Sequence, residues 1–153
     1  MHGEWNAVGL RLTKEADYAI RAMIHIACVP ENSLALRKDI VRLYAIPPSF
    51  SAKILRRLVE ADLLVATRGA HGGFALAKPA SAITLLHVVE AIEGPLGLTD
   101  CSTEPCGCTY AADCAAQPVW QEIQSTIAEL LGKATLEALV SAPRRKGREA
   151  GAR

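Results

Sequence analysis

The chain has 153 residues, of which 50% are hydrophobic, 22% charged and 5% aromatic, and its formal net charge is +1. This length suits one ordinary domain, or a small domain with an oligomerisation element. The composition excludes a disordered chain and argues against a carbohydrate-binding cleft, and no apolar run approaches the roughly 18 residues of a membrane span. Since residues 1–10 lack the layout of a signal peptide, we expect a cytoplasmic protein with no membrane partner.

The small net charge hides an uneven distribution along the chain. Residues 1–78 carry 11 Lys and Arg against 7 acids, whereas residues 79–132 carry 7 acids and no Lys or Arg. Residues 133–153 are basic again, with 6 Lys and Arg against 2 acids. A basic segment can meet a polyanion such as nucleic acid, and the acidic middle cannot. Four of the five Cys lie in that middle, where a reducing compartment favours metal ligands or redox groups over disulfides.

The chain is predicted to begin with a flexible extension at residues 1–9, which show no period. From Thr13 to Cys28, apolar residues recur at spacings of three and four, which predicts an amphipathic helix. Thr13 suits the N-cap of this helix, and Glu15 and Asp17 suit the positive end of its dipole. Cys28, alone near the end of the helix, is predicted to be a small core residue.

A helix-turn-helix and a β-hairpin are predicted next. In chain order the elements are helices over 36–44 and 48–61, then strands over 63–67 and 73–77 on either side of a glycine-rich tip at 68–72. Pro48 is placed to start the second of these helices, and the glycines of the tip permit a tight turn. This order is typical of a winged helix-turn-helix DNA-binding domain, to which we assign residues 10–82.

The second half of the chain is predicted to hold a loop between two helices. Thr84 suits the N-cap of a helix that ends near Glu93, and a loop of about twenty residues follows, a length that is usually functional or disordered. Pro118 starts a long helix whose apolar seam consists of Val119, Ile123, Ile127, Leu130 and Leu131. The assignment is a helix and Cys-rich loop over 83–117, a dimerisation helix over 118–141 and a disordered basic tail over 142–153. The predicted fold class is therefore mainly α with a small β-hairpin.

The residues predicted to contact DNA lie on the second helix of the helix-turn-helix and on the hairpin tip. The first residues of that helix normally reach base edges, its later basic residues suit phosphates, and an Arg at a glycine-rich tip suits a narrow minor groove. The candidates are Ser49, Phe50, Ser51, Lys53, Arg56 and Arg57 on the helix and Arg68, Gly69 and His71 at the tip. The alternative is a solvated charged surface, but the order of the elements favours DNA binding.

The four Cys of the acidic middle form a cluster with gaps of four, one and five residues: Cys101, Cys106, Cys108 and Cys114. Thiolates this close in sequence bind soft metals or iron–sulfur clusters. Structural zinc usually uses pairs separated by two to four residues, which this spacing fits poorly. The alternatives are a structural zinc ion or four unmetallated thiols. Because no Lys or Arg is near, we expect a bound cluster to lie away from DNA.

Several stretches together resemble the Rrf-two family of bacterial transcription regulators, from Leu10 to about Val140. The stretches are Leu10–Lys14 with Tyr18–Met23, Ile46–Leu64, Arg68–Phe74, the Cys loop followed by Val119-Trp120, and Thr135-Leu136 with Leu139-Val140. The family includes IscR-like and NsrR-like iron–sulfur regulators. The resemblance implies a homodimer held by the long helix after the Cys loop, and a 2Fe–2S or 4Fe–4S cluster that controls DNA affinity.

The resemblance also implies a ligand set. Cys101 and Cys114 match the outer of three Cys ligands, and either Cys106 or Cys108 matches the middle one. IscR-like members use a His three residues after the last Cys, where this chain has Gln117, a poor iron ligand. In some NsrR-like members an Asp of the first helix reaches across the dimer to the cluster, and Asp17 occupies that place. For Asp17, first-turn capping of its own helix is an equal alternative.

The leading interpretation is a dimeric, cluster-containing repressor that binds a double-stranded operator and senses nitric oxide, redox state or iron–sulfur status. A winged-helix regulator with a structural zinc is the main alternative. An electron carrier would leave the basic helix and the hairpin tip without use. An enzyme is not expected, because there is no plausible set of nucleophile, base and orienting group, and no phosphate loop.

Overall fold

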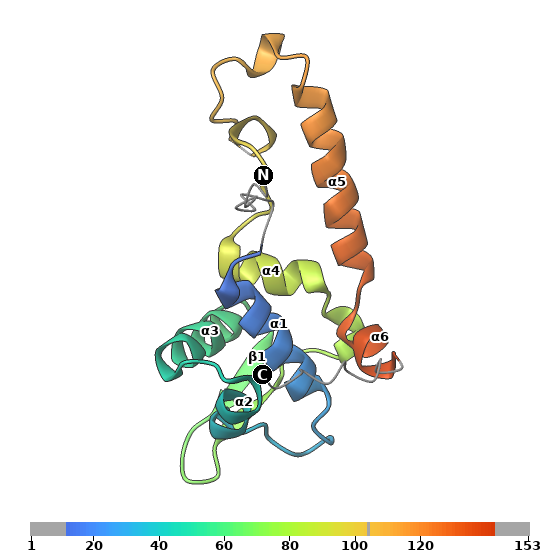
Figure 1. The fold of residues 1–153 in the computed structure, drawn as a ribbon. Coiled ribbons are helices and arrows are strands. Elements are labelled where there is room, and N and C mark those ends of the chain that lie inside the picture. Colours follow the sequence, from blue (N-terminus) through green and yellow to red (C-terminus); the bar gives the residue numbers. More distant parts are fainter. Residues whose placement is uncertain (1–11, 104, 143–153) are drawn as a thin grey trace, which may run out of the picture.

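A computed structural model describes residues 12–103 and 105–142 of the chain. The predicted extension at 1–9 and nearly all of the predicted tail at 142–153 lie outside the described residues. In chain order the helices and strands are α1 (Lys14–Ala27), α2 (Arg37–Tyr44), α3 (Pro48–Glu60), β1 (Leu64–Thr67), β2 (Gly73–Leu76), α4 (Leu85–Glu93), α5 (Gln117–Lys133) and α6 (Leu136–Ser141) (Figure 1). The predicted fold class, mainly α with one hairpin, is confirmed.

Helix α1 forms as its capping signals predict. The Thr13 hydroxyl accepts the backbone N–H of Ala16 at 3.2 Å, and the buried face of the helix includes Met23 and Ile26. The prediction for Cys28 is wrong, because this residue is exposed. It follows the last buried residue of the helix, Ile26, by two positions, which turns it about 200° away from the core face.

Helices α2 and α3 and the hairpin make the winged helix-turn-helix. Strands β1 and β2 pair antiparallel from Leu64 opposite Leu76 to Thr67 opposite Gly73. The tip between them folds tightly, because the Gly72 N–H donates to the Gly69 carbonyl at 3.0 Å and Gly69 has a φ of +109°. A Cβ on Gly72 would lie 2.3 Å from the Thr67 carbonyl oxygen, so the sharp tip requires glycine there.

One apolar core joins α1, α2, α3, α4, the hairpin and α6. Its fully buried members include Met23, Ile40, Leu58, Val88 and Leu136, with exposed fractions of 0%. Leu136 brings α6 into this core, and its N–H donates to the Ile83 carbonyl at 2.8 Å. The elements that share this core form the body of the protein. The chain after the Cys loop therefore returns to the body near the start of α4 (Figure 1).

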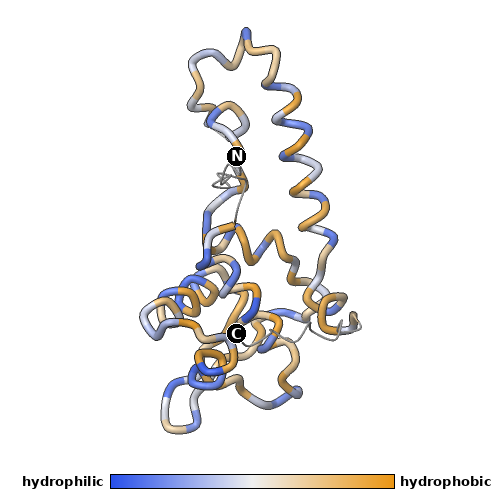
Figure 2. The backbone as a smooth tube through the Cα atoms, viewed as in Figure 1, coloured by the Kyte–Doolittle hydropathy of each residue, from blue (hydrophilic) through white to orange (hydrophobic). Residues whose placement is uncertain are grey.

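Helix α5 and the Cys loop rise from this body as a separate arm (Figure 1). No residue of α5 is buried, although Val119, Ile123 and Leu130 are large and apolar, with exposed fractions of 55%, 36% and 63%. Figure 2 shows apolar and polar residues alternating along this helix. Of the seam that the sequence predicts, these three residues are uncovered in a single chain, whereas Ile127 and Leu131 are half-buried. Among the described residues, no helix is long and apolar enough to cross a membrane.

Candidate nucleic-acid interface and cysteine loop

The first turn of α3 presents three of the predicted DNA contacts to solvent. Ser49, Phe50 and Lys53 are exposed, and together with Glu15 of α1 they line a small hollow. The Phe50 ring packs edge-on against Tyr18 of α1, with ring centroids 6.4 Å apart. Helix α1 therefore backs the end of α3 that is expected to reach base edges.

The structure corrects the assignment of Ser51. This residue is 2% exposed, and its hydroxyl donates to the Pro48 carbonyl at 2.8 Å. The same hydroxyl accepts the Nε–H of Arg37 at 3.0 Å, so it is fully engaged inside the protein and turned away from solvent. Ser51 follows Phe50 by one position, about 100° around the helix, which faces it inward.

Arg37 is a structural residue of this interface that the sequence analysis missed. Its Nη2 group donates to the Pro48 carbonyl at 2.8 Å, so that Arg37 and Ser51 together brace the first turn of α3. The N-cap Pro47 has no side chain that could do so. A cation in the first turn of α2 opposes the dipole of that helix, and this local conflict is the signal that could have drawn attention to Arg37.

The hairpin tip and the outer side of α3 form the second part of the interface. Arg68, Gly69 and His71 are all exposed at the tip, as predicted for contacts with a groove. Arg56 is 71% exposed and pairs with Glu60 at 3.5 Å. Arg37, Arg56 and Arg68 border one shallow groove between α3 and the hairpin, whose floor is apolar. The structure thus places three arginine side chains around one groove.

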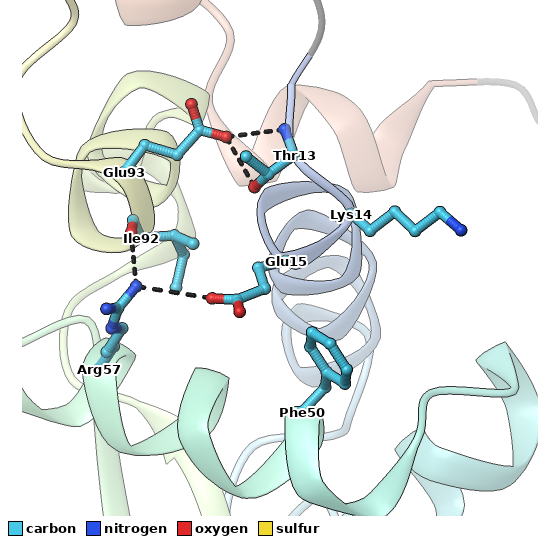
Figure 3. A pocket seen from close by; sticks show the side chains of 7 residues that line it. All are labelled: Thr13, Lys14, Glu15, Phe50, Arg57, Ile92 and Glu93. Carbon is cyan, nitrogen blue, oxygen red and sulfur yellow. Dashed lines mark hydrogen bonds and ion pairs between the residues drawn. The ribbon is translucent and has the colours of Figure 1, made fainter.

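Two predicted DNA contacts, Lys53 and Arg57, have acidic or carbonyl partners in this structure. Lys53 Nζ lies 2.8 Å from Glu15 Oε1. Arg57 Nη1 donates to the Ile92 carbonyl at 2.7 Å and lies 3.6 Å from Glu15 Oε2 (Figure 3). Arg57 therefore ties α3 to the end of α4, and its phosphate contact stays a prediction that requires an exchange of partners.

The start of α1 is also bonded to the end of α4, just before the Cys loop. Glu93 Oε1 accepts both the backbone N–H and the hydroxyl of Thr13, each at 2.9 Å (Figure 3). Asp17 lies one helical turn further along α1, where it is 52% exposed and pairs with Arg21 at 3.0 Å. The carboxylate of Asp17 is thus accessible, and its role as a cluster ligand stays a prediction.

The four thiols of the Cys loop are not bonded to one another. Cys101 Sγ lies 3.1 Å from Thr99 Oγ1, and the exposed Cys106 thiol donates to the Cys108 carbonyl at 3.7 Å. Cys108 and Cys114 are half-buried, and all four are free thiols. Within residues 12–103 and 105–142, no three His, Cys, Asp or Glu side chains are close enough to hold a metal ion.

Helix α5 is hydrogen-bonded to backbone groups of the Cys loop. The Gln124 side chain accepts the Leu98 N–H at 3.1 Å and donates to the Ser102 carbonyl at 2.7 Å. These two bonds fix the loop on both sides of Cys101. The N–H of Gln117 donates to the Cys114 carbonyl at 3.1 Å, so Cys114 is held at the start of α5. The outer two Cys are therefore anchored, whereas Cys106 and Cys108 lie between the anchors.

The donor chemistry of this loop fits an iron–sulfur cluster. It offers four free thiols within 14 residues, all partly or fully exposed, and soft thiolates are the ligands that such clusters use. In the described residues no three of these thiols are close enough to hold a metal ion, so cluster binding requires the loop to rearrange. The fold and this loop together define a winged-helix regulator with a thiol-rich arm.

Comparison with known proteins places the chain within that class. The Rrf2 family model, described as an iron-dependent transcriptional regulator, matches residues 12–142. The chain therefore belongs to the Rrf2 family, whose members are DNA-binding transcription regulators and not enzymes. The match spans all of the described residues, including the Cys loop and α5.

Solved structures of similar fold include other regulators. CymR (YrzC), the global cysteine regulator of B. subtilis, is 24% identical with a TM-score of 0.69, over 87% of this chain and 98% of that one. IscR from T. potens is 22% identical with a TM-score of 0.70, over 88% of each chain. A putative transcriptional regulator from Listeria innocua is 19% identical with a TM-score of 0.73, over 92% of this chain and 94% of that one. At these identities the likeness shows the fold alone.

Proposed function

We propose that this protein is a homodimeric cytoplasmic repressor that binds a double-stranded operator and carries an iron–sulfur cluster in its Cys loop. The observation that carries the proposal is the pairing of a winged-helix surface with four free thiols in an arm remote from that surface. The family's description as iron-dependent supports it.

The DNA surface consists of the first turn of α3, its outer basic side and the hairpin tip. Ser49, Phe50 and Lys53 face base edges, because the N-terminal residues of a recognition helix enter the major groove. Arg56 contacts phosphate, and Arg68, with Gly69 and His71, follows the adjacent groove. The groove between Arg56 and Arg68 adds Arg37 to this positive surface. Ser51 is left out of the surface because it is buried.

Cys101 and Cys114 hold the cluster together with one of Cys106 and Cys108, and Asp17 of the second copy supplies the fourth ligand. A bound cluster supplies iron that responds to nitric oxide, redox state or iron supply. The protein itself positions the two sites relative to each other. The contact between Thr13 and Glu93 joins the start of α1 to the end of α4, just before the loop, and Glu15 joins α1 to α3. A change at the loop thus has a short bonded route to the recognition helix.

The uncovered seam of α5 supports the dimer. Val119, Ile123 and Leu130 lie on one side of the helix and together expose a stripe with the spacing of a helix–helix contact. A second copy of α5 would bury this stripe, and a two-fold axis between the helices would present two α3 helices to a pseudo-palindromic operator.

Anaerobic purification tests the cluster directly. The proposal predicts brown protein with an iron–sulfur Mössbauer signature and equal iron and sulfide counts. Colourless protein that contains zinc would replace the proposal with a structural zinc site.

Single replacements identify the ligands. Either Cys106→Ala or Cys108→Ala is expected to leave the absorption spectrum nearly unchanged, and Asp17→Ala to lower cluster yield. If both Cys replacements abolish the spectrum, all four Cys are ligands and Asp17 serves only to cap α1. If one Cys is dispensable and Asp17→Ala has no effect, another group such as Gln117 or a small molecule is the fourth ligand.

A further inference from the structure

Glu15 is an acid placed at the DNA-reading end of α3. It lines the same hollow as Ser49, Phe50 and Lys53, all three of which belong to the proposed base-reading group. Its side chain is 21% exposed, whereas that of Lys53 is 45% exposed. Glu15 Oε1 accepts from Lys53 Nζ at 2.8 Å, and its second oxygen lies 3.6 Å from Arg57 Nη1. One carboxylate therefore faces two cations of α3, and one of them, Lys53, belongs to the proposed interface.

The position of Glu15 is unfavourable for an ordinary DNA-binding surface. A carboxylate beside the recognition helix repels phosphates and occupies the Lys53 ammonium that would otherwise attract them. Its contribution to folding is small, because ion pairs at a surface are screened and contribute little. Figure 3 shows Glu15 directed between Arg57 and Phe50, which is toward α3 and away from the Thr13–Glu93 contact.

We infer that Glu15 is a specificity-determining positioning residue, which holds Lys53 and thereby suppresses binding to DNA outside the operator. The inference rests on the proposed DNA contact of Lys53. A DNA phosphate can contact Lys53 only after the ion pair between Lys53 and Glu15 has broken. Non-operator DNA offers only phosphates in exchange, whereas an operator adds base contacts from the same helix. At the operator, the base contacts therefore offset the free energy lost with the ion pair. On other DNA, this loss is offset less and binding is weaker.

The test compares full-length wild-type protein and Glu15→Gln on a duplex of random sequence, titrated between 50 and 200 mM salt. Glutamine keeps the length of the side chain and removes the charge. Each additional phosphate contact steepens the slope of log affinity against log salt by about 0.9. We expect the slope of Glu15→Gln to be steeper than that of wild-type protein by about that amount. The ratio of its affinity to the wild-type affinity should therefore fall about threefold as the salt rises from 50 to 200 mM. A role in stability alone would leave this slope unchanged.

Matched variants make the comparison decisive. Glu31→Gln removes the same charge from an exposed position beyond the other end of α1 and is expected to keep the wild-type slope. In a Lys53→Ala background, Glu15→Gln is expected to change the slope little, because the cation it releases is gone. If Glu15→Gln does not fold, Glu15→Asp takes its place, because its shorter side chain withdraws the carboxylate from Lys53. This variant is expected to bind the random duplex more tightly than wild-type protein does. If its affinity is not raised, the inference is overturned.

The outcomes separate the inference from the proposed function. If wild-type protein binds DNA and Lys53→Ala weakens that binding, but Glu15→Gln behaves as Glu31→Gln does, only the inference fails. Weaker binding by Glu15→Gln also overturns it and would indicate that Glu15 accepts directly from a cytosine amino group. If Lys53→Ala has no effect on any DNA, the proposed role of Lys53 fails and the inference fails with it.

Discussion

The body formed by α1 to α4, the hairpin and α6 buries its apolar side chains, whereas the arm formed by the Cys loop and α5 leaves its own exposed. Each of the five helices of the body contributes a 0%-exposed residue: Met23, Ile40, Leu58, Val88 and Leu136. Along α5 no residue is buried, and Leu130 is 63% exposed. The body is thus stable by its own packing, and the arm has the features of a part that is completed by a second copy and a bound group.

The two regions also differ in their polar chemistry. Two cations of the body have internal partners, with Arg37 on Pro48 and Ser51, and Arg57 on Ile92. The arm contains thiols that have only weak partners, such as Cys106 at 3.7 Å from the Cys108 carbonyl. Groups with satisfied bonds serve to position, and groups without them are available to a ligand. Four predictions test this difference, from the largest expected effect to the smallest.

Replacement of an anchored thiol is expected to have the largest effect. Cys101→Ala and Cys114→Ala should each abolish the visible chromophore of anaerobically purified protein, because two remaining thiolates hold a cluster poorly. Absorption spectra with iron counts measure this loss. Cys28→Ala is the matched control, since Cys28 is exposed on the body, and it should keep the full spectrum. Normal cluster content in both anchored variants would refute the assignment of the arm.

A charge on the seam of α5 is expected to break the dimer. Ile123→Glu places a carboxylate where apolar burial of one large side chain is worth about 1.5–3 kcal/mol, so the dimer dissociation constant should rise by roughly a hundredfold or more. Sedimentation velocity measures the change. Ser125→Glu adds the same charge on the other side of the helix and should remain dimeric. Dimers of unchanged affinity in Ile123→Glu would show that another surface pairs the copies.

Loss of a basic side chain from the body is expected to weaken DNA binding without unfolding. Lys53→Ala should lose about 1–3 kcal/mol at the operator if Lys53 reads a base, and Arg68→Ala should weaken binding to all sequences and reduce the salt slope by about 1. Titration at fixed salt measures the first and a salt series the second. Lys133→Ala, on the arm, is the control. Wild-type affinity in both Lys53→Ala and Arg68→Ala would remove this surface from DNA binding.

The smallest expected effect is on stability. Arg37→Ala removes the brace on the first turn of α3, and hydrogen bonds from charged donors contribute about 1.5–3 kcal/mol before relaxation. For a domain of this size, each kcal/mol shifts the melting temperature by roughly 2–4 °C. Thermal unfolding followed by circular dichroism should show a loss of several degrees. An unchanged melting temperature would mean that Ser51 and Pro48 hold the turn without Arg37.

Local signals predicted the elements of this fold well. The cap at Thr13, the proline at Pro48 and the glycines of the hairpin tip act over a few residues, so the sequence contains all that decides them. The helix over 85–93 begins after Thr84 and ends before Gly94, as predicted. The seam of α5 was likewise visible, because a period needs no tertiary partner to be read.

Contacts between distant residues were not predictable in the same way. The place of Ser51 in the first turn predicts a DNA contact, but its hydroxyl is bonded to Arg37, 14 residues away in sequence. The pairing of Lys53 with Glu15 joins two helices, and no spacing rule reports it. Cys28 was misjudged because the helix phase at its end was not counted. For the Cys loop, the sequence shows which candidate ligands are present, whereas the loop conformation that brings them together depends on contacts between distant residues.

The most direct test of the central claim is the operator affinity of one preparation measured with and without its cluster. The operator is first selected from a random duplex library with cluster-loaded protein, and affinity is then measured at a single salt concentration before and after nitric oxide treatment and after removal of the cluster. Coupling between two sites is typically worth 5- to 150-fold in affinity, so we expect loaded protein to bind at least about fivefold more tightly. Equal affinity of loaded, nitrosylated and cluster-free protein would contradict the account.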